Sequence, residues 1–322
     1  MKVLVTLALL LGAVSSFADP STHDRPMMSR TLLRNTVRIE VVKSDGTVNV
    51  GTGFFYAFED KNRTSSIPVI VTCWHVVSDG ATGALFFALA STNWPARTQD
   101  HFTIALPQFD KYWIRHPDTN VDLAVMPLAP LIRLLKEQGK FLDVAPIGES
   151  LIPSDEELPK YGVFQEVKFI GYPIGIWDEK NNLPVVRRGM TATDPVIDYN
   201  GRTEFLVDAA VFPGSSGSPV FIANEGLNFF DGGLYSGSRV SFLGIMYGVY
   251  QYTSEGKAEI ITIPTAFDIK TKTAIPANLG IVVKAKRLAD FKGVFDQIER
   301  TLQEMTKKAP EGNGPPASNP QH

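Results

Sequence analysis

The chain has 322 residues, of which 44% are hydrophobic and 20% charged, and its formal net charge is −3. This is enough apolar sequence to bury one large core or two of modest size. A charge so close to zero does not indicate a nucleic-acid or anionic-membrane partner, and we predict neither.

The first residues predict an export signal. Lys2 precedes an apolar run over residues 3–14, and Ser16-Phe17-Ala18 follows as a small-x-small cleavage pattern. The run is too short to span a bilayer comfortably, and no later stretch is long enough to do so. We therefore expect cleavage after Ala18 and an exported protein, periplasmic or secreted, without a membrane span.

From about residue 32 the chain is a succession of short runs rich in β-branched and aromatic residues, separated by Gly, Pro, Asn and Asp. Many short strands with turn signals predict barrels or sandwiches and not alternating βαβ units. A more irregular stretch over residues 130–160 indicates a passage between two β units. The runs expected as strands are TVRIEVV (36–42), VNVGTGFFYAF (48–58), IPVIVTCWHVV (67–77), DLAVMPL (122–128), GVFQEVKFIGYP (162–173), LPVVRRGMTA (183–192), TEFLVDAAVF (203–212), SPVFIA (218–223), SFLGIMYGVYQY (241–252) and NLGIVVKA (278–285).

One amphipathic helix is predicted near the end of the chain. Its apolar residues recur at steps of three and four, and we expect this stripe to pack on the β body. The residues of the stripe are Leu288, Phe291, Phe295, Ile298, Leu302 and Met305. After Lys308 the sequence has no apolar periodicity and several Pro and Gly, which predicts a disordered tail.

Of the five histidines, His75 is the best candidate for chemistry. His23 and His322 lie in terminal segments, and His101 and His116 lie in polar, aromatic-rich loops. His75 alone ends a strongly apolar strand, IVTCWH, where a rigid element could hold the ring. Taken alone, such a histidine is more often a partly buried structural residue.

Two further stretches supply the other groups that serine acyl transfer requires. Asp122 stands immediately before an apolar run, where it either caps a turn or orients an imidazole. In FPGSSGSPVF, residues 212–221, Gly214 and Gly217 flank a pair of serines. Both glycines allow a tight loop with converging N–H groups, although an isolated match of this kind is more often a surface turn.

The order of these residues along the chain decides between the readings. Serine acyl transfer needs a hydroxyl, an imidazole, an orienting carboxylate and oxyanion donors. An α/β-hydrolase would place its serine first and would need a glycine where Ser218 stands. The order His75, Asp122, Ser216 is that of the chymotrypsin-like arrangement.

The sequence also resembles a known family. GTGFFYAF, VTCWHVV, NVDLAVMPL, EVKFIGYPIG, LVDAAVFPGSSGSPVF and FLGIMYG are similar to successive landmarks of trypsin-like peptidases, in particular the bacterial Deg/HtrA-type branch. The resemblance covers roughly residues 35 to 300. It implies an all-β fold of two six-stranded antiparallel barrels, chymotrypsin-like, with a C-terminal amphipathic helix. The units would be a signal peptide (1–18), an N-terminal segment (19–34), two barrels (35–150 and 151–285), the helix (286–308) and the disordered tail (309–322).

The resemblance implies a role for each site residue. His75 would be the general base, Asp122 its orienter and Ser216 the nucleophile, in a cleft between the barrels. The N–H groups of Gly214 and Ser216 would form the oxyanion hole. The pocket for the residue before the cleaved bond would be shaped by Ala210, Val211, Tyr247, Gly248 and Val249. No acidic residue stands at its expected base, which favours small or aliphatic side chains, and no cofactor or metal is implied.

Three departures from the family pattern matter. Trypsin-type enzymes use an aspartate just before the nucleophile to receive a newly cut N-terminus, whereas this chain has Ser215, so we expect no activation by that salt bridge. Cys73 has no disulfide partner within the chain, and we expect it to be a small buried hydrophobic residue. About 70 residues follow Tyr252, so we expect no PDZ domain.

The sequence therefore predicts an exported serine endopeptidase that forms an acyl-enzyme on protein or peptide substrates. Two alternatives stay open. One is a trypsin-fold protein that binds without cutting, and the other is a serine esterase.

Overall fold

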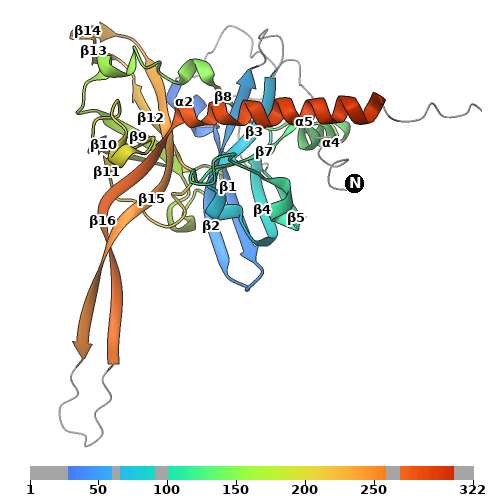
Figure 1. Cartoon of the computed structure of the whole chain (residues 1–322), viewed down its shortest axis with the longest axis horizontal. Coiled ribbons are helices and arrows are strands. Elements are labelled where there is room, and N and C mark those ends of the chain that lie inside the picture. Colours follow the sequence, from blue (N-terminus) through green and yellow to red (C-terminus); the bar gives the residue numbers. More distant parts are fainter. Residues whose placement is uncertain (1–27, 60–65, 91–100, 259–268, 308–322) are drawn as a thin grey trace, which may run out of the picture.

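The computed structural model describes residues 28–59, 66–90, 101–258 and 269–307. The expected signal peptide, most of the N-terminal segment and the C-terminal tail lie outside these residues. The expected all-β fold is confirmed: an eight-stranded, mostly antiparallel sheet and a closed six-stranded barrel lie side by side, and one long helix runs across them (Figure 1).

The N-terminal sheet is barrel-like and follows the order β5-β4-β1-β2-β3-β7-β6, with β8 paired in parallel to β2. Its central strands are buried on nearly every residue, as in the run of six buried residues in the middle of β2. The strands are β1 (Thr36–Lys43), β2 (Val48–Glu59), β3 (Ser66–Thr72), β4 (Gly80–Ala88), β5 (His101–Pro107), β6 (Ile114–Arg115), β7 (Ala124–Pro127) and β8 (Ile147–Gly148).

The C-terminal unit is the closed barrel β10-β11-β16-β15-β12-β9. Exposure alternates along β10, where every second residue faces inward, whereas β11 and β12 each have four consecutive buried residues. The paired strands β15 and β16 continue past the barrel as a long two-stranded ribbon (Figure 1). The strands are β9 (Glu166–Gly171), β10 (Val185–Thr191), β11 (Glu204–Asp208), β12 (Pro219–Asn224), β15 (Arg239–Ala258) and β16 (Ile269–Lys284), with a separate hairpin of β13 (Leu227–Phe230) and β14 (Gly233–Ser236).

Helical segments are short apart from the last helix. The α-helices are α2 (Met28–Leu33), α3 (Trp74–Val77), α4 (Ala129–Glu137) and α5 (Asp290–Lys307). The 3-10 turns are η1 (Phe109–Tyr112), η2 (Glu149–Leu151), η3 (Leu158–Tyr161), η4 (Pro173–Gly175), η5 (Tyr199–Gly201) and η6 (Ala285–Ala289). No helix in the described ranges is long and apolar enough to cross a membrane.

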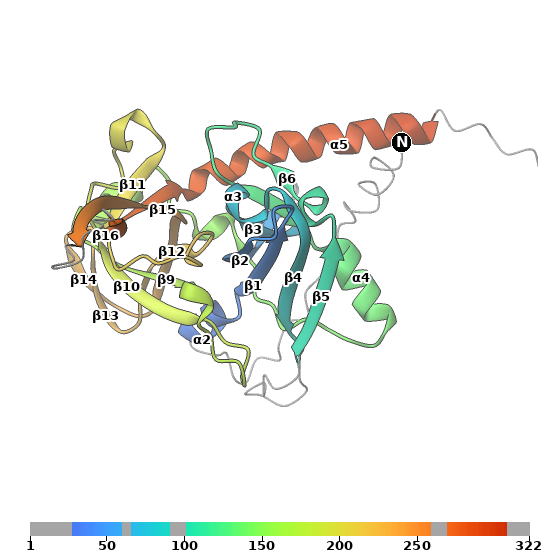
Figure 2. The ribbon, with the colours of Figure 1, turned by 90° about the horizontal axis from the view of Figure 1, so that it is seen from below.

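The predicted C-terminal helix leaves the barrel and packs on the other unit. Phe291 and Phe295 lie against Phe58 of β2, with ring centroids 6.3 and 5.1 Å apart. Leu288 is also fully buried and Ile298 is half-buried, whereas the side chains of Leu302 and Met305 lie outside the described part. Figure 2 shows α5 running along the N-terminal sheet, so the apolar stripe fastens the two units together.

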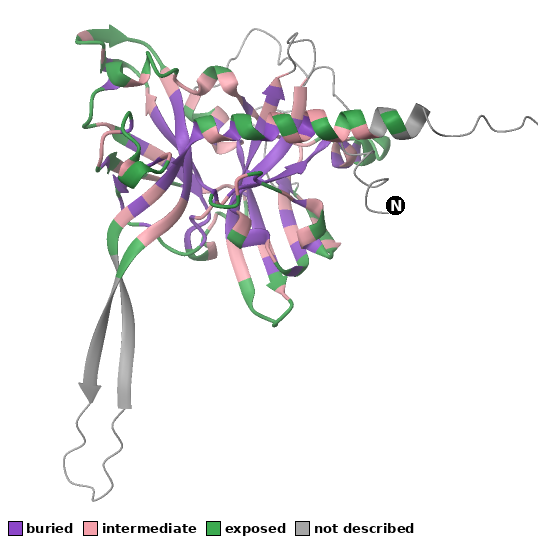
Figure 3. Ribbon diagram, viewed as in Figure 1, coloured by how far each residue is buried: buried purple, intermediate pink, exposed green. Residues whose placement is uncertain are grey.

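Two hydrophobic clusters fill the molecule. The larger one extends from the N-terminal sheet through barrel residues such as Phe221 and Phe242 to α5, and the smaller one fills the barrel interior around Phe169, Phe205 and Met246. Buried residues accordingly follow the strands of both units and the sheet-facing side of α5 (Figure 3). The core is thus continuous across the junction of the two units.

Two details differ from the sequence-based expectation. The strand leading to His75 ends at Thr72, and His75 itself lies on the helical turn α3. The N-terminal sheet also contains strands that the sequence does not signal, because β6 and β8 are two residues long and β4 is rich in Gly and Ala. Strands so short have no period from which to recognise them.

Candidate active site

His75 and Asp122 come together at the edge of the N-terminal sheet. The backbone N–H of His75 donates to Asp122 Oδ1 over 2.9 Å, and the imidazole Nδ1 contacts Asp122 Oδ2. The side chains are 48% and 24% exposed, respectively. Because a carboxylate accepts hydrogen bonds, it fixes the proton on Nδ1 and leaves Nε2 as the free nitrogen of the ring.

The turn α3 is set by packing beneath it. Val76 and Val77 are buried. His75, which lies between the end of β3 and these two valines, is exposed and points outward. A Cβ at Gly51 of β2 would overlap Val76, so a glycine is needed for the turn to approach the sheet. The Trp74 N–H also donates to the Asp122 carbonyl oxygen over 3.4 Å. The imidazole therefore stands on a rigid, closely packed corner.

Ser216 lies in a tight loop that only glycine can form. Gly214 and Gly217 have φ values of +88° and +89°, a region that L side chains rarely adopt. A Cβ would overlap the Tyr172 carbonyl oxygen at Gly214 and the Thr52 carbonyl oxygen at Gly217. We call residues 212–218 the serine loop.

The serine loop is bonded to the corner that carries His75. The Ser216 carbonyl oxygen accepts a hydrogen bond from the N–H of Thr52 over 2.9 Å. The Met246 carbonyl oxygen accepts from the Gly217 N–H over 2.8 Å and from Cys73 Sγ over 3.4 Å. Gly217, next to Ser216, and Cys73, two residues before His75, thus bond to the same acceptor, which places the segments that carry Ser216 and His75 side by side.

Thr52 is a site residue that the sequence analysis did not assign. It is fully buried, and its Oγ1 donates to the Gly214 carbonyl oxygen over 2.8 Å while accepting from the Tyr172 N–H over 3.1 Å. Its own carbonyl oxygen accepts from Thr72 Oγ1 over 2.7 Å. The only sequence signal was the G-T-G of GTGFFYAF, where a polar residue between two glycines begins an apolar strand.

The predicted oxyanion donors have no hydrogen-bond partner among the described residues. Within the described ranges, neither the Gly214 N–H nor the Ser216 N–H donates a hydrogen bond to another protein group. The neighbouring N–H groups of Ser215 and Ser218 are instead used inside the loop, each over 3.0 Å. The loop therefore reserves two donors that a ligand oxygen could use.

The predicted pocket residues lie in different environments. Ala210 is exposed, whereas Val211 is 5% exposed and belongs to the barrel core. Tyr247, Gly248 and Val249 are half-buried on β15, where the pairing with β16 shifts register. Burial, followed by the negative charge of Glu204, raises the pKa of Tyr247. The β15 stretch thus offers an irregular, partly open edge beside the serine loop.

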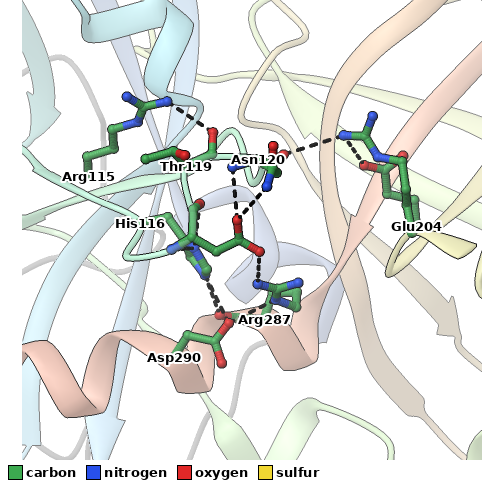
Figure 4. A network of polar contacts seen from close by, with 9 residues as sticks. Arg115, His116, Thr119, Asn120, Glu204, Arg287 and Asp290 are labelled. Atoms are coloured by element: carbon green, nitrogen blue, oxygen red, sulfur yellow. Dashed lines mark hydrogen bonds and ion pairs between the residues drawn. The ribbon is translucent and has the colours of Figure 1, made fainter.

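The loop that carries Asp122 is braced by a polar network (Figure 4). His116, expected in a loop, has a buried ring that accepts from the Asp118 N–H at Nδ1 and donates from Nε2 to the Arg287 carbonyl oxygen, each over 3.1 Å. Arg287, at the entry to α5, donates to Asp118 over 2.9 Å and to Asp290 over 2.8 Å. The start of α5 therefore fixes the loop that positions Asp122.

Cys73 completes a group of three side chains with metal-ligating atoms. Its Sγ, a nitrogen of His75 and an oxygen of Asp122 lie within 4.8 Å of one another. Burial raises the pKa of the Cys73 thiol well above its ordinary value, and a neutral thiol is a poor metal ligand. The cysteine is free and buried, as expected, and serves as a packed residue that donates to Met246.

Several solved structures are similar to the chain. They include the HtrA-type protease AlgW with a tripeptide (14% identity, TM-score 0.44, 86% of this chain and 65% of that one) and the serine endoprotease from Yersinia pestis (14%, 0.42, 86% and 68%). Another is the inactive form of Rv3671c from M. tuberculosis (15%, 0.38, 90% and 98%). The chain spans 60% and 65% of the two AlgW chains that it matches. A search of curated proteins finds no match.

A family model supplies the assignment. The model described as a trypsin-like peptidase domain matches residues 51–227, more than half of the chain. The match includes His75, Asp122 and the whole serine loop. The chain belongs to the family of trypsin-like peptidase domains.

Proposed function

We propose that the protein is an exported serine endopeptidase with His75, Asp122 and Ser216 as its catalytic triad. The observation that carries the proposal is the double hydrogen bond from His75 to Asp122 beside a glycine-dependent loop that bears Ser216. A carboxylate that holds both the backbone and the ring of one histidine leaves that ring no freedom to turn. This arrangement suits a general base better than it suits a surface histidine.

In the proposed reaction, Nε2 of His75 takes the proton of the Ser216 hydroxyl as its oxygen attacks the peptide carbonyl carbon. The C–N bond then breaks, and the same proton passes to the leaving amine. Water next attacks the acyl-enzyme with His75 again as base, which releases the acid and restores the serine. Asp122 stabilises the imidazolium throughout and does not itself become protonated.

The N–H groups of Gly214 and Ser216 would stabilise the oxyanion of both tetrahedral intermediates. Their lack of protein partners supports this role, because donors that are already positioned need no reorganisation as charge develops. The positive φ of Gly214 directs its peptide group, which makes that glycine part of the machinery.

An extended peptide would pair with the β15 edge at Tyr247–Val249. Ala210 and the backbone at Val211 would line the pocket for the side chain before the cleaved bond. None of these residues is acidic, which favours small or aliphatic side chains over Lys or Arg. A peptide library cut mainly after basic residues would contradict this preference.

A serine-directed fluorophosphonate probe tests the proposal. Wild type should be labelled and Ser216→Ala should not. Ser238→Ala, at an exposed serine between β14 and β15, should be labelled like wild type. Turnover of casein should fall on the order of 10⁴-fold or more in Ser216→Ala. Wild-type turnover should rise from acid to neutral pH, because only a neutral imidazole accepts a proton.

The two alternatives give different results in the same experiment. A trypsin-fold binding protein would not react with the probe. An esterase would label at Ser216 and hydrolyse p-nitrophenyl esters but leave casein intact.

A further inference from the structure

A half-buried cation lies beside the serine loop without any assigned role. Arg187 is on β10, at a position whose side chain faces the barrel side of the alternating pattern, whereas its neighbour Arg188 is exposed. Inward positions of a small barrel are usually filled by apolar side chains. A guanidinium at such a position needs an explanation.

This guanidinium contacts the serine loop and β9, the strand next to β10. Arg187 is paired in register with Phe169 of β9, and its guanidinium carbon lies 4.9 Å from the centre of that ring. It lies 5.1 Å from the ring of Phe212, the first residue of the loop. Its Nη1 donates to Oγ of Ser215, the residue before Ser216, over 3.1 Å.

Among the described residues, no carboxylate pairs with the Arg187 guanidinium. Burial lowers the pKa of Arg187, and no opposite charge offsets this effect. An apolar side chain would fill the same space without desolvating a charge. Arginine can tolerate the position because its guanidinium is weakly hydrated and stacks on aromatic faces. Fold stability alone therefore does not account for this residue.

We infer that Arg187 is a positioning residue that holds the serine loop in its oxyanion-binding conformation; this rests on the proposed function. Trypsin-type enzymes place an aspartate before the nucleophile and hold it with a newly cut N-terminus. In this chain the neutral acceptor Ser215 stands in place of the aspartate, and the cation is a side chain of β10 instead of a newly cut N-terminus. The loop is therefore held without cleavage of the chain.

Arg187 contacts the serine loop at two positions, and both can affect the N–H groups that would bind the oxyanion. We call these two contacts the Arg187 clamp. Phe212 begins the loop, and Ser215 lies between the residues whose N–H groups would bind the oxyanion. Gly214 and Gly217 give the loop access to many backbone conformations, so side-chain contacts must select one of them. Complete loss of one oxyanion donor costs about 10²–10³-fold in turnover. A loop that only samples the right conformation part of the time should lose less, about 10- to 100-fold.

The first test compares Arg187→Ala, Arg187→Lys and the matched control Arg188→Ala by the rate of fluorophosphonate labelling. Arg187→Ala should slow labelling about 10- to 100-fold, Arg188→Ala should match wild type, and Arg187→Lys should lie between them, since it keeps charge but not the planar stacking. Millimolar guanidinium ion should restore part of the rate to Arg187→Ala, and sodium chloride at equal ionic strength should not. A structural role alone would not produce this rescue.

A second readout does not depend on activity. Amide hydrogen exchange of peptides spanning residues 212–218 should be faster in Arg187→Ala than in wild type, with exchange of the N-terminal sheet unchanged. If wild type does not react with the probe but loop exchange is faster in Arg187→Ala, the proposed function is refuted, whereas the role of Arg187 in holding the loop is still supported. If wild type reacts with the probe but Arg187→Ala shows the same labelling rate and the same loop exchange, the inference that Arg187 holds the loop is refuted.

Discussion

The two halves of the candidate site are held by different kinds of interaction. On the N-terminal sheet, His75 is fixed by hydrogen bonds to the side chain of Asp122. On the C-terminal barrel, the serine loop depends on backbone conformations that favour glycine and on backbone hydrogen bonds, to which Thr52 and Arg187 add side-chain contacts. Removing the carboxylate of Asp122 should therefore leave the fold intact, whereas replacing a glycine of the serine loop should disturb the fold as well as the site.

The largest expected effect is the loss of turnover when the Asp122 side chain, which holds His75, is changed. In Asp122→Asn the amide presents the wrong hydrogen-bonding group to the ring, so the tautomer with a free Nε2 is lost, and turnover should fall on the order of 10⁴-fold. The melting temperature should stay close to that of wild type, because the substitution keeps the shape of the side chain. Asp110→Asn, elsewhere on the same unit, serves as control. A loss of less than tenfold would remove Asp122 from the triad.

The next largest effect is expected when a glycine that shapes the backbone of the serine loop is replaced. Gly217→Ala places a Cβ in a left-handed conformation and against the Thr52 carbonyl oxygen, so both turnover and the free energy of unfolding should fall. Gly139→Ala is the matched control, because Gly139 has φ +69° but nothing within 4 Å. The control should lose only the strain, about 1–2 kcal/mol, and Gly217→Ala clearly more. If urea unfolding gives the same loss of unfolding free energy for both variants, the overlap with the Thr52 carbonyl oxygen adds no destabilisation.

The smallest effect concerns the brace between α5 and the loop of Asp122. Arg287→Gln removes the bonds to Asp118 and Asp290, so the unfolding midpoint at pH 7 should drop by a few degrees, with a smaller loss of turnover. Arg300→Gln, at an exposed position of α5, should change neither.

The brace also makes a prediction about pH. The hydrogen bond from Arg287 lowers the pKa of Asp118 below its ordinary value. A depressed carboxyl pKa stabilises the fold above the unfolded pKa, and this contribution disappears as pH falls through the folded value. The difference between wild type and Arg287→Gln should therefore shrink at strongly acidic pH. If the stability difference between wild type and Arg287→Gln is the same at pH 7 and at acidic pH, the effect of Arg287 does not depend on ionised Asp118.

Local patterns in the sequence determined much of this molecule. Runs of β-branched and aromatic residues gave the long strands, the three- and four-residue spacing gave α5, and the glycines around Ser216 indicated a loop that other residues could not form. The order of His75, Asp122 and Ser216 singled out one family of folds. Apart from that order, each of these signals lies within a short window, where periodicity and backbone preference act directly.

Contacts between distant parts of the chain were decided only by the tertiary structure. Thr52 holds a loop 162 residues away, and His116 is buried against a residue 171 positions later. The sequence placed His75 on a strand, whereas packing of Val76 over Gly51 turns that segment into a helical corner. A polar residue such as Thr52 or Arg187 carries no periodic signal of its partner. Its role is set by which strands the closed barrel and the neighbouring sheet bring together.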